Sequence, residues 1–272
     1  MTASASPFDL AAVVGALRAA GCVFAEDEAG LLLDAANTPS ELAAMIERRT
    51  AGLPLEQVLG WAEFRGLRIA VDVGVFVPRR RTEFLVHQAA ALLSRDCEGR
   101  NPPVVVDLCC GSGAVGAALV ASLARIELHA SDIDGAAVAC ARRNLPGGRV
   151  HRGDLYGALP GALRGRVDVL AVNAPYVPTD AVALMPPEAR LHEPRVALDG
   201  GTDGVDIQRR VAAGAPAWLA PNGHLLIETS RQQAPLTAAA FADAGLVPRV
   251  VHGEDVGATV VVGARRTDQR PG

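Results

Sequence analysis

The first part of the chain carries hydrophobic residues at the three- and four-residue spacing of an α-helix. That spacing predicts short helices at about 7–20, 28–36 and 39–49. Ser6-Pro7 has the residue types that begin a helix, and Thr38-Pro39-Ser40-Glu41 has the spacing of a capping box. We therefore expect residues 1–65 to form a small helical bundle.

Short runs of β-branched and apolar residues replace the helical pattern between about 66 and 81. Residues 68–71 and 75–77 have the composition of strands, and Asp72 and Gly74 separate them. We expect this segment to be a β-hairpin that links the helical bundle to the rest of the chain.

From residue 82 to the end, helical and strand patterns alternate. Helices are predicted at about 82–94, 114–123, 135–144, 205–219 and 232–244. Strands are predicted to begin near Val104, Glu127, Arg149, Val167, His224, Val247 and Thr259. This alternation is typical of an α/β fold, so we expect residues 82–272 to form a mostly parallel sheet covered by helices. A short glycine-containing turn separates the last two strands, and we expect one of them to be antiparallel.

Composition and charge narrow the classes of function. Half of the residues are hydrophobic, enough for a sizeable core, and the net charge of −4 provides no overall positive field for nucleic acid. Only the run Arg79-Arg80-Arg81 favours such a partner locally. The cysteines lack C-x-x-C spacing and the histidines are scattered, so we expect no metal site. With neither a signal-peptide pattern nor an apolar run of ~18 residues, we expect a cytoplasmic protein.

A glycine-rich loop follows the first strand of the predicted sheet. Gly111, Gly113 and Gly116 fit the pattern G-x-G-x-x-G, which lets a backbone approach a cofactor beside a helix N-terminus. Asp132 ends the next strand, where a carboxylate can hold ribose hydroxyls. Both a nicotinamide dinucleotide and S-adenosylmethionine fit this arrangement, so an NAD-dependent oxidoreductase stays open at this point.

Asp107 distinguishes the two cofactors. It comes shortly before the first glycine, where a carboxylate would repel a pyrophosphate but attract the cationic amine of a methionine group. The charge therefore favours S-adenosylmethionine. Cys109 and Cys110 follow a buried strand and have no histidine near them in the sequence, so we interpret them as packing residues of the loop.

A second candidate loop ends the strand that begins near Val167. Its sequence is Asn173-Ala174-Pro175-Tyr176, and it belongs at the carboxyl edge of the sheet, where open α/β folds bind ligands. The Asn173 side chain and a neighbouring main-chain carbonyl can both accept hydrogen bonds from one NH2 group, and the Tyr176 ring can stack on a planar group. The loop therefore favours methyl transfer to an amide or amine nitrogen, although alone it also fits a simple turn.

This loop resembles the Asn-Pro-Pro-Tyr motif of amino-methyltransferases that act on adenine, guanine or glutamine nitrogens. Together with residues 54–83, Asp132, Gly153-Asp154-Leu155 and the segment from Glu193-Pro194 through Gly204, it resembles the bacterial release-factor glutamine methyltransferases. The resemblance covers nearly the whole chain. It implies a Rossmann-like class I methyltransferase sheet of seven strands, and an N-terminal helical domain that recognises the substrate. It further implies methylation of the N5 amide of a glutamine in a protein such as a peptide chain release factor.

The resemblance also implies roles for individual residues. The residues implied to hold S-adenosylmethionine are Asp107, Cys109, Cys110, Gly111, Ser112, Gly113, Asp132, Ile133, Asp154, Leu155 and Asn173. The residues implied to hold the substrate amide are Asn173, Ala174, Pro175 and Tyr176. Among the cofactor residues, Asp132 is expected at the ribose and Asp154 with Leu155 beside the adenine.

Two positions depart from the family pattern. Ala174 stands where the motif has proline, which keeps the main-chain carbonyl but gives up backbone order worth about 0.5–1 kcal/mol. Arg81 stands where the family segment Pro-Arg-Pro-Glu-Thr-Glu has an acidic residue. Arg80 and Arg81 either point into solvent or reverse the charge beside the substrate.

We therefore expect an S-adenosylmethionine-dependent methyltransferase that acts, as a monomer, on a protein glutamine. Asn173 and the Ala174 carbonyl would accept both N–H groups of the amide, favour its pyramidalisation and stabilise positive charge as the methyl transfers. No strong general base is required. The alternatives are a nucleic-acid amino-methyltransferase and a catalytically silent adaptor that binds the cofactor, and we expect no membrane association and no direct contact with nucleic acid.

Overall fold

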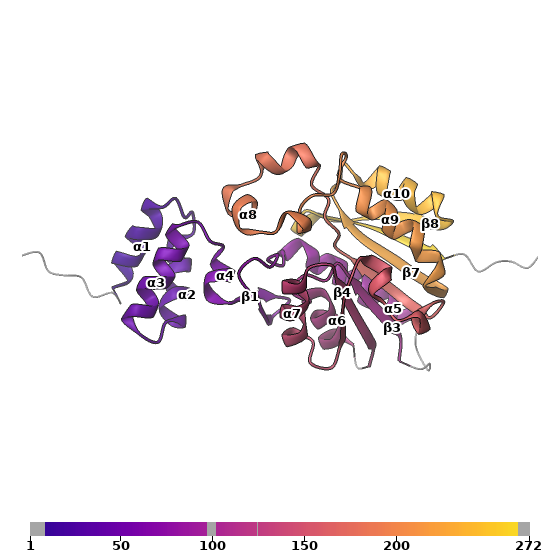
Figure 1. Cartoon of the computed structure of the whole chain (residues 1–272), viewed down its shortest axis with the longest axis horizontal. Helices are drawn as coiled ribbons and strands as arrows, with labels where there is room; N and C mark the ends of the chain where they lie inside the picture. The colour runs from indigo at the N-terminus through magenta and orange to yellow at the C-terminus, as the bar shows by residue number, and fades with distance from the viewer. Residues whose placement is uncertain (1–8, 97–101, 124, 266–272) are drawn as a thin grey trace, which may run out of the picture.

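The computed structural model describes residues 9–96, 102–123 and 125–265, and the predicted helix start at Ser6-Pro7 lies outside them. The N-terminal helices are α1 (Leu10–Ala19), α2 (Ala25–Ala35), α3 (Pro39–Thr50) and α4 (Leu55–Leu59). Side chains cap two of these helices, because Asp9 accepts from the Ala11 amide and Thr38 accepts from the Glu41 amide. Helices α1–α3 form a bundle at one end of the molecule (Figure 1).

A small hydrophobic core holds this bundle together. Its buried residues are Val13, Leu17, Ala25, Ala29, Leu32, Leu42, Met45 and Val58. They recur at helical spacing within each helix, so each helix turns one apolar face inward. The predicted N-terminal helices are confirmed, with the second helix beginning slightly earlier than expected. Residues 61–64, expected within the 1–65 bundle, form a strand instead.

The hairpin that follows differs from the predicted one. β1 (Trp61–Phe64) pairs with β2 (Leu67–Ala70), whereas residues 75–77 form no strand, so the predicted second strand is wrong. Arg65 and Gly66 make the turn with φ of 52° and 73°. A two-residue turn with positive φ matches the twist of paired strands, so this pairing forms in preference to the longer connection through Asp72 and Gly74.

The remaining strands form one seven-stranded sheet in the order β5-β4-β3-β6-β7-β9-β8. Their bounds are β3 (Val104–Leu108), β4 (Glu127–Asp132), β5 (Arg149–Arg152), β6 (Val167–Val172), β7 (Leu219–Thr229), β8 (Leu246–Gly253) and β9 (Ala258–Arg265). Strand β9 is antiparallel to β7 and β8, and the other neighbouring pairs are parallel. The predicted fold class is confirmed, including one antiparallel strand among the last two.

Helices cover both faces of the sheet. They are α5 (Glu83–Asp96), α6 (Ala114–Ser122) and α7 (Gly135–Asn144) on one face, with α9 (Asp206–Gly214) and α10 (Ala234–Asp243) on the other. Successive residues of β3 serve the two faces in turn, since Val105 packs in the first core and Val104 and Val106 in the second. All five helices match predicted segments. Short 3-10 turns are η1 (Arg80–Thr82), η2 (Leu155–Ala158), η3 (Gly161–Leu163), η4 (Thr179–Leu184), η5 (Arg195–Ala197), η6 (Ala215–Ala217) and η7 (Glu254–Val256).

One further helix, α8 (Pro187–His192), lies between the N-terminal bundle and the sheet (Figure 1). Gln57 of α4 donates to the carbonyls of Val75 (3.1 Å) and His192 (3.4 Å), and Arg49 of α3 lies 3.5 Å from the Glu188 carboxylate. These polar contacts join the bundle to the segment that leads into the candidate site. No helix in the described part of the chain is both long and apolar enough to cross a membrane.

Candidate functional site

A cavity of about 250 Å³ opens at the carboxyl ends of β3, β4 and β6. The strand order places β4 on one side of β3 and β6 on the other, so the chain turns in opposite directions here, as at ligand sites of open α/β sheets. All the predicted site residues line this cavity except Gly113. A Cβ atom at Gly113 would lie 3.0 Å from Leu145, and φ there is 79°, so this glycine serves the packing of α6.

The glycine loop turns its backbone sharply beneath the cavity. Cys109 has φ of 60° and Gly111 has φ of 54°, and the Cys110 amide donates to the Ser131 carbonyl at 3.0 Å. A positive φ is costly for a residue with a side chain. The loop therefore holds a strained, fully specified shape at the point where the sequence predicts a cofactor.

Asp107 lies under this loop as a buried carboxylate. It is 1% exposed, and its Oδ2 atom accepts from the Gly116 amide at 2.9 Å. Burial raises the pKa of Asp107 to about 7, and the nearby Asp132 carboxylate adds to the increase. A cationic group in the cavity would restore the negative charge of Asp107, which agrees with the charge argument for a methionine amine.

Asp132 stands on the rim of β4 with both oxygens engaged. Oδ2 accepts from the Gly111 amide and Oδ1 from the Asp134 amide, each at 2.9 Å. Burial raises the pKa of Asp132, while these amides oppose the increase. A carboxylate has about four acceptor positions, so Asp132 retains acceptor capacity for hydroxyl groups. The adjacent Ile133 is 49% exposed and lines the cavity.

The far wall contains Asp154 and Leu155. The Asp154 carboxylate accepts from Arg210 at 2.6 Å, and both side chains are half exposed. Leu155 has φ of 46°, so a second non-glycine residue with positive φ lines the cavity besides Cys109. Arg210 was not predicted, because nothing local in α9 marks it as a partner of Asp154.

The two loop cysteines have the environment of packing residues. Burial raises the pKa of the Cys109 and Cys110 thiols well above the usual value, and the charges of Asp107 and Asp132 raise it further. Both thiols therefore stay protonated at neutral pH. Among the described residues, no group of three or more His, Cys, Asp or Glu side chains is arranged to hold a metal ion.

The 173–176 loop forms another wall of the cavity. Three of its polar groups matter for binding: the Asn173 amide, the Ala174 carbonyl and the Tyr176 phenol. The Asn173 Nδ2 atom donates to the Thr82 hydroxyl at 3.4 Å, which leaves Oδ1 to accept from another group. No described residue donates to the Ala174 carbonyl. Burial raises the pKa of Tyr176 to about 12, so its phenol stays neutral. The loop therefore presents two oxygen acceptors beside a neutral aromatic ring.

Two of the three arginines of the 79–81 segment pair with buried acids, so the segment does not form a free basic patch of three charges. Arg79 lies 2.6 Å from Glu193, and the Arg81 Nε atom lies 3.3 Å from Glu228, which is 1% exposed. Burial raises the pKa of both glutamates, and the arginines oppose the increase. Arg81 also stands 5.8 Å from the centre of the Tyr176 ring. Both Arg80 and Arg81 are exposed, but only Arg81 also lines the cavity.

Several lining residues carry no local signal in the sequence. Phe64 of β1, Phe76 and Thr82 lie in the hairpin and the segment after it, and they reach the cavity only because the hairpin folds back onto the sheet. Asn144 of α7 fixes that position, since its side chain bonds both the amide and the carbonyl of Ala70 at 2.9 Å. The Thr82 contact with Asn173 could have been suspected only from the resemblance of residues 54–83.

Comparison with known proteins finds methyltransferases in each case. The family model of the methyltransferase small domain matches residues 67–201. A release factor glutamine methyltransferase of Streptomyces coelicolor is 39% identical over 192 residues, 70% of this chain and 67% of that protein. A protein of the same name from Geobacter sulfurreducens is 34% identical over 248 residues, covering 88% and 84% of the two chains.

Solved structures extend the likeness to the fold. A methyltransferase from Pyrococcus furiosus aligns with a TM-score of 0.54 and 16% identity, over 84% of this chain and 100% of that chain. At this identity the match concerns the architecture of the sheet and its helices. It agrees with the α/β fold described above.

Proposed function

The chain belongs to the release factor glutamine methyltransferases, which are S-adenosylmethionine-dependent enzymes, and we propose that it methylates the side-chain amide of a glutamine in a peptide chain release factor of its own organism. The observation that carries this proposal is the pair of acceptors at Asn173 and Ala174 beside the neutral Tyr176 ring. An amide NH2 group has two donors and a flat shape, so it complements that arrangement. We further propose that the enzyme works as a monomer in the cytoplasm.

S-adenosylmethionine fits the other half of the cavity, where it would supply an electrophilic methyl group. Asp107 would face the methionine amine, whose positive charge offsets the cost of burying that carboxylate. Asp132 has acceptor capacity for the ribose hydroxyls, and Asp154 with Leu155 would lie beside the adenine. Cys109, with its strained backbone, and the next residues through Ser112 line this half of the cavity.

The 173–176 loop would hold the substrate amide for in-line transfer. Asn173 Oδ1 and the Ala174 carbonyl would each accept one N–H, which orients the nitrogen lone pair toward the methyl group. The same oxygens stabilise the positive charge that develops on the nitrogen. The amide proton can leave after transfer, so we assign no general base. The Ala174 carbonyl is the group required there, and alanine supplies it as proline does.

The surroundings of the cavity favour a protein substrate over a nucleic acid. Arg79 and Arg81 pair with Glu193 and Glu228, so within the local basic run only the exposed Arg80 is left to contact a phosphate. We propose that residues 1–65 and the hairpin region recognise the folded substrate, because α8 connects the bundle to Glu193 at the cavity rim. The alternative function on nucleic acid thereby loses its main support.

Methyl transfer from labelled S-adenosylmethionine to the purified release factor of the same organism tests the proposal. The expected result is one labelled protein, with the label on a glutamine after proteolysis and mass spectrometry. Label found only in nuclease-sensitive material of a host lysate would replace this function with the nucleic-acid one. Cofactor binding without transfer to any acceptor in that lysate would make the chain a silent adaptor.

A further inference from the structure

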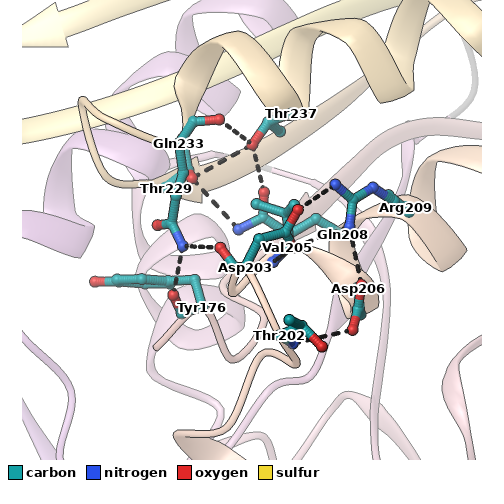
Figure 2. Close-up of polar contacts among 10 residues, drawn as sticks. All are labelled: Tyr176, Thr202, Asp203, Val205, Asp206, Gln208, Arg209, Thr229, Gln233 and Thr237. Atoms are coloured by element: carbon teal, nitrogen blue, oxygen red, sulfur yellow. Dashed lines mark hydrogen bonds and ion pairs between the residues drawn. The ribbon is translucent and has the colours of Figure 1, made fainter. Parts of the chain in front are cut away.

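Gln233, the residue before α10, lies outside the cavity and donates hydrogen bonds to the backbone on the substrate side of it. Its Nε2 atom donates to the Tyr176 carbonyl at 2.7 Å and to the Asp203 carbonyl at 3.0 Å (Figure 2). Gln233 is 9% exposed, so both amide protons are used in a buried setting. One side chain thus joins the end of the 173–176 loop to the 199–206 segment.

The orientation of this amide is specified by its oxygen. The Ser230 hydroxyl donates to Gln233 Oε1 at 2.7 Å, and the same hydroxyl accepts from the Gln233 backbone amide at 3.1 Å. Exchanging the amide nitrogen and oxygen would face Oε1 toward two carbonyls and Nε2 toward the hydroxyl. That loses the hydrogen bonds to both carbonyls, so the observed orientation is the stable one.

Buried polar contacts keep the start of α10 in place. The Thr237 hydroxyl donates to Gln208 of α9 at 2.6 Å and lies 3.4 Å from the Thr229 hydroxyl of β7 (Figure 2). Gln208 and Thr237 are both 0% exposed. Because sheet, α9 and α10 meet in this network, Gln233 extends from a rigid support.

The 199–206 segment packs directly on the backbone of the site loop. A Cβ atom at Gly200 would lie 2.7 Å from the Pro175 carbonyl, and one at Gly204 would lie 2.2 Å from Gln233 Nε2 and 2.4 Å from the Tyr176 carbonyl. Glycine is required at both positions, because any side chain would push the two segments apart. The Val177 amide also donates to the Leu198 carbonyl at 3.0 Å.

We infer that Gln233 is a positioning residue for methyl transfer: it holds the 173–176 loop so that the Asn173 and Ala174 oxygens keep the spacing that one amide NH2 group requires. The inference rests on the proposed function. Gln233 donates to the Tyr176 carbonyl, whereas no described residue donates to the Ala174 carbonyl. With alanine in place of a proline at 174, the loop has less order of its own, and the contacts of Gln233 supply it from outside.

Gln233→Met tests the inference, with Gln232→Met as its matched control. Methionine keeps the length of the side chain but has no amide donors, and Gln232 is the same residue type one position away with an exposed side chain. We expect kcat toward the release factor to fall about tenfold or more in Gln233→Met, since small displacements of catalytic groups have effects of this size. The Kd of S-adenosylmethionine should stay unchanged, because Gln233 contacts none of the cofactor residues. Gln232→Met should match the wild type.

Hydrogen–deuterium exchange supplies a readout that does not depend on activity. The backbone amides of Val177 and Thr179, which donate to the Leu198 and Gly201 carbonyls, should exchange faster in Gln233→Met, whereas those of β3 should not. Ser230→Ala is the second variant if Gln233→Met folds poorly. It removes the hydroxyl that orients the Gln233 side-chain amide, while the Gln233 backbone amide keeps the Ser230 carbonyl as an acceptor at 3.1 Å. It should change exchange and kcat in the same direction and less.

The outcomes separate the inference from the proposed function. Unchanged kcat and unchanged exchange in the Gln233 and Ser230 variants would overturn the inference while the wild type still methylates the release factor. Equal losses in kcat and in cofactor affinity would also overturn it, because they indicate general damage to the fold. If the wild type methylates another acceptor instead, the proposed function fails, and the same comparison with that acceptor decides the inference. If the wild type methylates nothing, the inference fails with it as a statement about catalysis.

Discussion

The two halves of the cavity are built in different ways. On the cofactor side, the contacts that shape the loop join residues close in sequence: Gly116 with Asp107 at a separation of 9, and Gly111 with Asp132 at 21. On the substrate side, Asn173 is bonded to a residue 91 positions away and Tyr176 to one 57 positions away. Arg81 and Glu228 are 147 positions apart.

The two halves differ because the cofactor and the substrate amide place different requirements on the residues that hold them. A cofactor of constant shape can be held by one strand–loop–helix unit, whose backbone amides and carboxylates come from neighbouring segments. A substrate amide must be held between the cofactor and a recognition surface, so its loop depends on elements from several parts of the chain. We therefore expect variants on the two sides to affect different steps: cofactor affinity on one, turnover on the other.

The largest expected effect is that of Asn173→Ala. Loss of the Oδ1 acceptor should lower kcat about a hundred- to thousandfold, as removal of one transition-state hydrogen bond does in other enzymes. Steady-state kinetics measures kcat, and calorimetry measures the Kd of S-adenosylmethionine, which should change little. Matching losses in the two quantities would show that Asn173 serves the cofactor half instead.

Asp107→Asn should act on affinity instead of turnover. The amide retains an acceptor for Gly116 but loses the charge, so the Kd of S-adenosylmethionine should rise by about tenfold or more, corresponding to a charged hydrogen bond of ~1.5–3 kcal/mol. Calorimetry at pH 8 measures this change. An unchanged Kd would remove Asp107 from the cofactor site.

The pH dependence of that affinity gives a separate test. Because the pKa of Asp107 is about 7 before binding, a cationic ligand must displace a proton at lower pH. The Kd should therefore be constant above pH 7 and rise up to ~tenfold per pH unit below it. The Asp107→Asn variant should lose this dependence. A wild-type Kd that stays constant within experimental error between about pH 5.5 and about pH 8 would contradict the assigned role.

Arg81→Gln tests the distant contacts of the substrate half. It leaves Glu228 buried without its cation, which should lower the free energy of unfolding by about 1–3 kcal/mol. The lower end is expected, because the Arg81 side chain is 47% exposed. Denaturant unfolding measures the change, and Arg80→Gln, an exposed neighbour, should have no such effect.

The smallest effect on the cofactor side is expected from Gly113→Ala. The added methyl would crowd Leu145 and Ala141 and force a left-handed φ on alanine, at a cost of about 1–2 kcal/mol in stability. The Kd of S-adenosylmethionine should remain close to the wild-type value, because Gly113 packs α6 and does not line the cavity. A large rise in Kd with unchanged stability would restore Gly113 to the binding residues.

Much of the fold could be predicted because its signals are local. The seven strands of the sheet and the helices that cover it follow from hydrophobic runs and helical spacing, and the glycine loop and the 173–176 loop lie at strand ends. In a parallel sheet, such ends converge on one edge, so both loops were expected at one site. The linking hairpin was the exception, because two turn signals competed and only the pairing geometry distinguishes Arg65-Gly66 from Asp72 and Gly74.

The sequence by itself determined the chemistry that the site can offer: a carboxylate for a cationic amine, another for hydroxyls, and an asparagine beside a tyrosine for an amide. Only the tertiary structure decided which distant side chains keep these groups in position. Thr82, Gln233 and Glu228 meet the site through packing of the hairpin, α10 and β7. Such contacts leave no periodic trace along the chain, because they depend on where separate elements lie in space and not on the residues next to them.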